Sequence, residues 1–184
     1  SIGVSKSKID AINRDMDEMN KMSFDKKQTY PKLWDILVNV SDDQIFIKKG
    51  FDDVIREAFK VSPAIEQIDL DKFIHFPDQN QGSNCCTMSI MGRDYYNRDG
   101  FIYDPRFESL WCDIVEQEKA LIRGCYKYVD NRIFDHLHPS FGQTAYDEQY
   151  RKTEAFEVRQ RDYNTYLQCK KEYDPTTIYP IRAI

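Results

Sequence analysis

The sequence contains no long run of apolar residues. Its longest runs, such as Ile36 to Val38, fall far short of the roughly 20 apolar residues that span a bilayer, and no secretory signal is visible. An excess of basic residues is also missing, because the net charge is −5. That balance argues against a general binder of polyanions. We therefore expect no transmembrane segment and no nucleic-acid partner.

Cysteine pairs with the spacing of a redox or metal-binding motif are missing as well. The chain has five cysteines, an odd number, at Cys85, Cys86, Cys112, Cys125 and Cys169, and none of them forms a Cys-x-x-Cys pair. This pattern indicates neither a disulfide framework nor a zinc site. We expect reduced, mostly packed thiols in a cytoplasmic protein.

Apolar and aromatic side chains are present in sufficient number for one hydrophobic core. Hydrophobic residues make up 41% of the 184 residues and aromatic residues 14%, which is too rich for a disordered chain although 31% of the residues are charged. A chain of this length can bury one sizeable core. We expect a single domain over 1–184, with 145–184 as a C-terminal helical extension, and leave the oligomeric state open.

The order of apolar patterns along the chain predicts an α/β fold. Apolar residues at helical spacing predict helices, and short apolar runs bounded by polar residues predict buried strands. The predicted helices lie at about 9–19, 51–59, 109–122 and 145–171, and the predicted strands at about 33–40, 65–70, 73–76, 85–91 and 125–134. Because strands and helices alternate, we expect a mostly parallel sheet flanked by helices, with a C-terminal helix appended.

Two adjacent carboxylates follow the strongest predicted strand. Asp42 and Asp43 come where the strand over 33–40 ends, and ligands of open α/β sheets gather beyond the carboxyl ends of the strands. One or two carboxylates together with substrate phosphates are a common way to hold Mg²⁺ or Mn²⁺. Helix capping or simple solvation is the alternative for the pair.

Two of the three histidines flank a single residue. His136 and His138 would project to the same side of an extended segment, so the pair could face a divalent ion, or one ring could pack while the other is solvated. His75 stands alone between apolar residues, and we expect it to be structural.

Asp113 follows Trp111-Cys112 at the predicted start of a helix. A carboxylate at this position can interact favourably with the exposed amides of the helix start. It can also act as a general base if an acceptor hydroxyl comes within hydrogen-bond reach. The sequence pattern is compatible with both roles.

Several short segments occur in an order that resembles family 2 glycosyltransferases of the GT-A fold, especially small bacterial and phage-type members. These segments are Ser41-Asp42-Asp43, Gly50-Phe51, Gly100-Phe101-Ile102-Tyr103, Trp111-Cys112-Asp113 and His136-Leu137-His138-Pro139. The resemblance covers most of the chain. It implies a nucleotide-diphosphate sugar as donor, and a glycan or another hydroxyl compound as acceptor.

The resemblance also implies a role for individual residues. Asp43 would be a ligand of Mn²⁺ or Mg²⁺, Asp42 would lie near the ribose or the metal, and Asp113 would be the catalytic base. His136 or His138, with His138 preferred, would complete the metal site, while Lys8 and Asn13 would meet the nucleotide. Transfer would be a direct displacement with inversion.

The chain departs from the family pattern in two places. It opens at what resembles a later loop, so that the first βαβ portion of the nucleotide-binding fold is expected to be absent, and the metal motif is Ser-Asp-Asp in place of Asp-x-Asp. Two other functions therefore stay open. The first is a noncatalytic glycan-binding or interaction protein, and the second is a metal-dependent hydrolase that uses Asp42, Asp43, His136 and His138.

Overall fold

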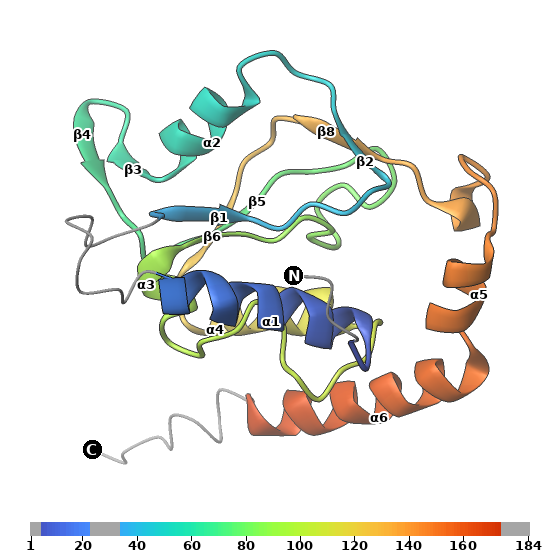
Figure 1. Ribbon diagram of the computed structural model, residues 1–184. Coiled ribbons are helices and arrows are strands. Elements are labelled where there is room, and N and C mark those ends of the chain that lie inside the picture. Colours follow the sequence, from blue (N-terminus) through green and yellow to red (C-terminus); the bar gives the residue numbers. More distant parts are fainter. Residues whose placement is uncertain (1–4, 23–33, 174–184) are drawn as a thin grey trace, which may run out of the picture.

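The computed structural model describes residues 5–22 and 34–173, which form helices and short strands in a mixed α/β arrangement (Figure 1). The helices are α1 (Lys8–Met22), α2 (Phe51–Ala58), α3 (Arg93–Tyr96), α4 (Cys112–Ile122), α5 (Glu148–Thr153) and α6 (Phe156–Glu172), with a 3-10 turn at Pro139–Phe141. The strands are β1 (Ile36–Val38), β2 (Gln44–Phe46), β3 (Lys60–Ser62), β4 (Ile65–Ile68), β5 (Phe73–His75), β6 (Ile90–Gly92), β7 (Tyr126–Tyr128) and β8 (Phe134–His136). The lysine-rich connection expected around 21–31 lies largely outside the described residues, as does the tail beyond Pro175.

Four of these strands form the main sheet, in the order β1-β6-β5-β7. β6 pairs antiparallel with both β1 and β5, and β5 pairs in parallel with β7. It follows that β1, β5 and β7 all run in one direction and that β6 runs against them. The segments that follow β1 and β5 therefore leave the sheet at the same edge.

The prediction of a mostly parallel sheet is wrong. Among the strand pairs of the described residues, only β5–β7 is parallel, and the small pairs β2–β8 and β3–β4 are antiparallel. The reason lies in the connection between β5 and β6, over 76–89, which contains no helix. A parallel return needs a long crossover that is usually helical, and here the chain turns back instead. The prediction of a mixed α/β chain with a C-terminal helix is confirmed.

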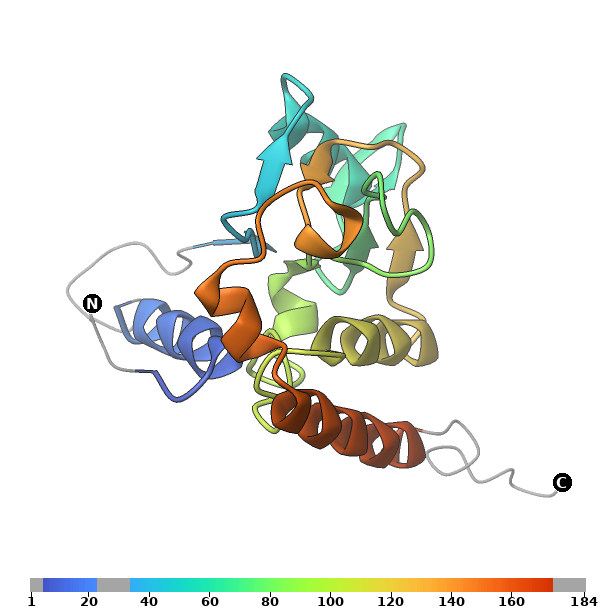
Figure 2. The ribbon, with the colours of Figure 1, turned by 90° about the vertical axis from the view of Figure 1, so that its right-hand side faces the viewer.

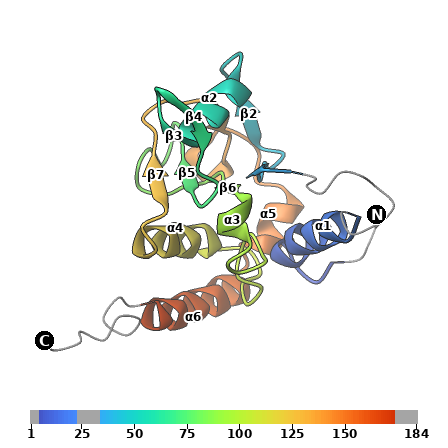
Figure 3. The ribbon, with the colours of Figure 1, turned by 90° about the vertical axis from the view of Figure 1, so that its left-hand side faces the viewer.

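Alternate residues of the sheet enter two different hydrophobic clusters, as the period of two in a strand requires. Leu37, Phe73 and Met91 lie in one cluster with the buried residues of α1 and α4. Their chain neighbours Ile74 and Ile90 lie in the other cluster, with Ile55 and Phe59 of the α2 segment. Figure 3 shows the result, with α2 above the sheet and α1 and α4 below it.

The N-terminal helix begins directly after a serine whose side chain caps it. The Ser7 hydroxyl accepts a hydrogen bond from the Asp10 N–H at 3.1 Å, and the Asp10 carboxylate accepts one from the Lys6 N–H at 2.9 Å. This reciprocal pair satisfies donors that a helix start otherwise leaves free. Ile9 and Met16 then turn their side chains into the core.

The C-terminal extension consists of two helices in place of the single one expected over 145–171. α5 ends at Thr153 and α6 begins at Phe156, and between them Ala155 has an extended backbone. The break lets α5 lie beside the start of α1 while α6 runs beneath α4 (Figure 2). Asp162 of α6 is fully buried and accepts hydrogen bonds from three successive backbone N–H groups, those of Glu108, Ser109 and Leu110.

Gly92 at the end of β6 has a steric function. A Cβ atom placed there would lie 2.1 Å from the carbonyl oxygen of Leu70. Only glycine therefore permits the approach of these two backbone segments.

In the ranges that the structure describes, no helix has the length and apolar character needed to cross a membrane.

Candidate active site

The β2–β8 pair brings together two of the residues singled out in the sequence. Gln44 is opposite His136 in the antiparallel register, which places Asp43 beside the histidine. The Nε2 atom of His136 lies 3.1 Å from Oδ2 of Asp43, and the Leu137 N–H donates to the Asp43 carbonyl at 2.8 Å. The predicted proximity of these two segments is therefore present in the fold.

A second carboxylate, Asp78, lies on the other side of the same imidazole. It follows β5 just as Asp43 follows β1, and its Oδ2 is 3.6 Å from Nδ1 of His136. The Asp78 side chain is fully buried, and it accepts hydrogen bonds from the Asn80 N–H, the Gln81 N–H and the Thr87 hydroxyl. The imidazole is thus held between two ionised groups.

This arrangement changes the protonation of all three groups. Burial disfavours the imidazolium, but hydrogen bonds to Asp43 and Asp78 outweigh it and raise the pKa of His136 to about 9. Burial likewise opposes ionisation of both aspartates, yet the hydrogen bonds they accept hold the pKa of Asp43 and of Asp78 well below the usual range. At neutral pH the site contains an imidazolium between two carboxylates.

The carboxylate of Asp43 accepts two further hydrogen bonds. The Ser41 hydroxyl donates to one carboxylate oxygen and the Tyr150 hydroxyl, which comes from α5, donates to the other. Burial, the larger effect, and the hydrogen bond to Asp43 raise the pKa of Tyr150 well above that of a free phenol. Asp42, the adjacent carboxylate, is exposed.

His138 is held by the C-terminal extension. Its ring centroid is 5.4 Å from that of His136, so the two rings do lie together. Nδ1 of His138 accepts a hydrogen bond from the Ser140 N–H at 3.2 Å, and Nε2 lies 3.6 Å from a carboxylate oxygen of Glu154. Burial and the neighbouring His136 charge lower the pKa of His138.

The three side chains implied as metal ligands do not fit a metal ion in this arrangement. Both ring nitrogens of His136 face carboxylates, whereas a histidine that binds a metal is neutral and uses a free ring nitrogen. His138 is engaged at both nitrogens as well, and Asp43 at both oxygens. Within 5–22 and 34–173, no group of three or more His, Cys, Asp and Glu side chains is placed to hold a metal ion.

Asp113 lies in the first turn of α4, directly after a residue with an unusual backbone. Trp111 has φ of 59° and is the only residue other than glycine with a positive φ in the described chain. Such a backbone costs of order 1 kcal/mol or more and is often retained at functional sites. The Asp113 carboxylate accepts a hydrogen bond from the Ile114 N–H at 2.8 Å and a weak one from the Cys85 thiol at 3.4 Å.

Two cavities meet at Asp113. The central cavity, of about 310 Å³, is lined by Lys8, Ser41, Gln44, Tyr103 and Gln149. The aromatic cavity, of about 380 Å³, is lined by Trp111, Phe141, His136, His138, Asn80 and Arg159. Thr87 and Asp113 line both cavities. The Asp113 side chain can therefore contact a molecule in either cavity.

Lys8 and Asn13, the two residues expected near a nucleotide, have different surroundings. Lys8 lines the central cavity together with Asp113. The Asn13 amide instead binds backbone, since its nitrogen donates to the Tyr103 carbonyl at 2.7 Å and its oxygen accepts from the Ile102 N–H at 3.1 Å. Asn13 holds the loop that precedes α4 and does not line the described cavities that contain Lys8 or Asp113.

Comparison with protein-family models, with characterised proteins and with solved structures gives no significant match to this chain.

Sequence reasoning missed three residues of this site. Asp78 lies in a polar stretch that follows β5, much as Asp43 follows β1. Tyr150 and Glu154 belong to the segment over 145–171, for which the sequence predicts only a helix. No periodic pattern distinguishes these residues, because their contacts depend on where α5 returns to the sheet.

Proposed function

We propose that this protein is a glycosyltransferase that moves a sugar from a nucleotide-diphosphate sugar to an acceptor hydroxyl. The observation that carries the proposal is the position of Asp113 between two cavities, one with Lys8 and one with aromatic and polar side chains. The acceptor hydroxyl must contact both the base and the anomeric carbon of the donor, so the base of a transferase lies where the donor and acceptor sites meet. The ordered motifs of the sequence support the same function.

In the proposed reaction, Asp113 is the general base. Its carboxylate takes the proton of the acceptor hydroxyl, and the acceptor oxygen forms a bond to the anomeric carbon of the sugar. The bond between that carbon and the diphosphate oxygen breaks, and the electron pair leaves with the diphosphate. Attack from the side opposite the leaving group inverts the anomeric configuration. The residues implied as metal ligands take no part in these steps, because they are engaged with one another and with their protein neighbours.

The decisive substitution is Asp113→Asn, which removes the base and keeps the shape of the side chain. We expect nucleoside diphosphate release from a panel of nucleotide-diphosphate sugars, with simple glycans as acceptors, to fall by roughly 100-fold or more. Donor affinity, measured by calorimetry, should change less than threefold. Asp53→Asn is the matched control, because Asp53 is an exposed carboxylate in the first turn of α2.

Equal turnover in Asp113→Asn and wild type would remove Asp113 as the base. A second function, noncatalytic glycan binding, is favoured by one observation, namely that Trp111 and Phe141 line the aromatic cavity beside amide and guanidinium groups. In that case the chain would bind glycans without any release of nucleoside diphosphate. The same two measurements therefore separate the two functions.

A further inference from the structure

Three lysines, Lys6, Lys8 and Lys152, lie at the junction of α1 and α5. Within the described residues, the ammonium groups of Lys6, Lys8 and Lys152 form no ion pair and no hydrogen bond, whereas Lys60, Lys72, Lys119 and Lys170 are all paired with carboxylates. All three are exposed side chains. Like charges that are not paired repel one another, so their presence at one place calls for an explanation.

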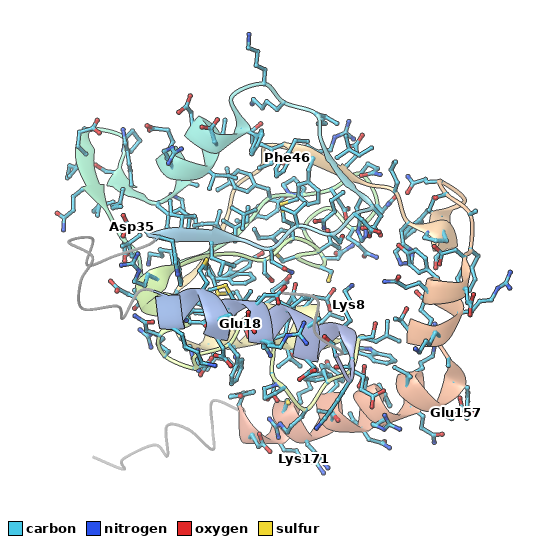
Figure 4. The ribbon with its side chains drawn as sticks, viewed as in Figure 1. Lys8, Glu18, Asp35, Phe46, Glu157 and Lys171 are labelled. Carbon is cyan, nitrogen blue, oxygen red and sulfur yellow. The ribbon has the colours of Figure 1, made fainter. Side chains whose placement is uncertain are left out.

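These lysines line one cavity, which we name the lysine cavity. Its volume is about 580 Å³, and its walls come from the start of α1, the 108–109 backbone, α5 and the start of α6. The hydroxyl groups of Ser7, Ser109 and Thr153 also line it. Figure 4 shows Lys8 at the end of α1 that faces α5. The cavity thus offers ammonium and hydroxyl donors to a ligand.

The charge balance of the lysine cavity is positive. Its lining contains two acidic residues, Glu108 and Glu148, against the three lysines. Glu108 is paired with Arg161 and its charge is compensated there. One carboxylate, Glu148, remains against three ammonium groups. The whole chain has a net charge of −5, so this positive site stands out from its surroundings and favours an anionic ligand.

The lysine cavity continues into the central cavity. Lys8, Ser109 and Gln149 line both of them, just as Asp113 and Thr87 line both the central and the aromatic cavities. The three cavities therefore form a row, with ammonium groups at one end and Asp113 further along. A molecule with an anionic group in the lysine cavity can extend a neutral group toward Asp113.

We infer that Lys6, Lys8 and Lys152 form a diphosphate-binding site that takes the place of the expected metal ion. This inference rests on the proposed function for the identity of the ligand, a nucleotide-diphosphate sugar. Three ammonium groups supply the positive charge that a diphosphate requires, whereas the candidate metal ligands are engaged with one another and with protein partners. The side chain of Lys8 lies where the diphosphate joins the sugar.

The test is calorimetric titration of the full chain with inorganic pyrophosphate, once in EDTA and once with Mn²⁺. We expect saturable binding in EDTA, and a loss of at least tenfold in affinity in the double variant Lys8→Ala/Lys152→Ala. Lys171→Ala is the matched control, because Lys171 is an exposed, unpaired lysine on α6, away from α5 (Figure 4). It should bind as wild type does.

Binding that requires Mn²⁺ and is lost in Asp43→Asn would overturn the inference in favour of a metal site. Unchanged affinity in the double variant, or no binding of pyrophosphate in EDTA, would overturn it as well. A parallel titration with nucleoside diphosphates shows whether the site accepts a nucleotide or a free phosphate compound. Pyrophosphate binding needs neither sugar nor acceptor, so a lysine-dependent result without any turnover would sustain the site and refute the proposed transferase.

Discussion

At the scale of single residues, His136 is the most heavily constrained group of the site. Its imidazole ring lies between Asp43, which faces Nε2, and Asp78, which faces Nδ1, and only 16% of the side chain is exposed. Removing one member of such a group leaves a buried charge without compensation, which is more costly than never having placed the charges there. The three side chains should therefore behave as one unit in any substitution experiment.

We predict that this unit makes stability depend on pH at both ends of the range. The pKa of His136 is raised from 6.5 to about 9, so its contribution is fully present below pH 6.5 and is lost as pH rises to 9. The pKa of Asp43 and of Asp78 is lowered from 3.8, so their contribution is lost as pH falls below that value. Urea unfolding should give a free energy of unfolding that is lower at pH 9.5 than at pH 5.5 by roughly 3 kcal/mol.

His136→Gln is the control for that pH dependence, because glutamine keeps hydrogen-bonding groups without a titrating charge. It should be less stable than wild type at pH 5.5 and should lose much less stability between pH 5.5 and 9.5. If both proteins lose the same free energy over that interval, another group causes the loss.

The sequence predicted some of these residues and not others, for a physical reason. Asp43 and His136 were found because each belongs to a short motif beside a predicted strand. Asp78 contacts His136 because the loop after β5 is hydrogen-bonded to the end of β8, and Tyr150 contacts Asp43 because α5 folds back. Both contacts depend on distant segments coming together. Local patterns of polarity contain no information on such pairing.

At the scale of elements, the link between α6 and the loop before α4 is the contact on which the site depends most. The Asp162 carboxylate is fully buried and accepts hydrogen bonds from the backbone N–H groups of Glu108, Ser109 and Leu110, with N···O distances of 3.0, 2.8 and 2.8 Å. This loop continues into Trp111, whose ring contacts Tyr163 of α6 with centroids 5.5 Å apart. The C-terminal helix thus sets the backbone that leads to Asp113.

We predict that Asp162→Ala lowers the free energy of unfolding by about 3 kcal/mol, because it leaves three backbone donors without an acceptor. Asp162→Asn retains one acceptor oxygen and should have an intermediate effect. Gln160→Ala, at an exposed position of the same helix, should change the free energy by less than about 0.5 kcal/mol. Chemical denaturation followed by circular dichroism measures all three. Equal stability of the two alanine variants would mean that the loop does not need the carboxylate.

The elements also show where sequence patterns fail to determine topology. The periodic segments that became α1, α2 and α4 were predicted with nearly correct bounds, and so was the strand at β5. The direction of β6 was not, because it depends on whether the connection over 76–89 contains a helix. The polar part of that connection, over 77–84, turns back because Asp78 binds the Asn80 and Gln81 backbone N–H groups and the Thr87 hydroxyl. A pattern of apolar residues does not reveal these bonds.

At the scale of the whole molecule, the main sheet joins two hydrophobic clusters. Phe73 faces the cluster that contains α1 and α4, and the adjacent Ile74 faces the one that contains α2. Both tryptophans, Trp34 and Trp111, pack against the first cluster. A sheet of short strands shared in this way gives neither cluster a separate framework, so we expect the two to unfold together.

We predict that Ile74→Val, a substitution in the second cluster, shifts the tryptophan fluorescence transition although both tryptophans contact the first. The change removes one buried methylene group and should destabilise the fold by about 1 kcal/mol. Urea midpoints measured by fluorescence and by far-ultraviolet circular dichroism should move by the same amount. A fluorescence midpoint that stays at the wild-type value would show that the two faces of the sheet unfold independently.

The way Asp78 organises its own loop bears on how this protein can vary in sequence. One buried carboxylate accepts hydrogen bonds from the backbone N–H groups of Asn80 and Gln81 and from the Thr87 hydroxyl, and it lies beside the His136 ring. Added or deleted residues between 78 and 87 would pull these partners away from a single pair of oxygens. Homologues that share this chemistry should therefore differ in the length of their other surface loops while keeping the length of this one, and an aspartate at its start.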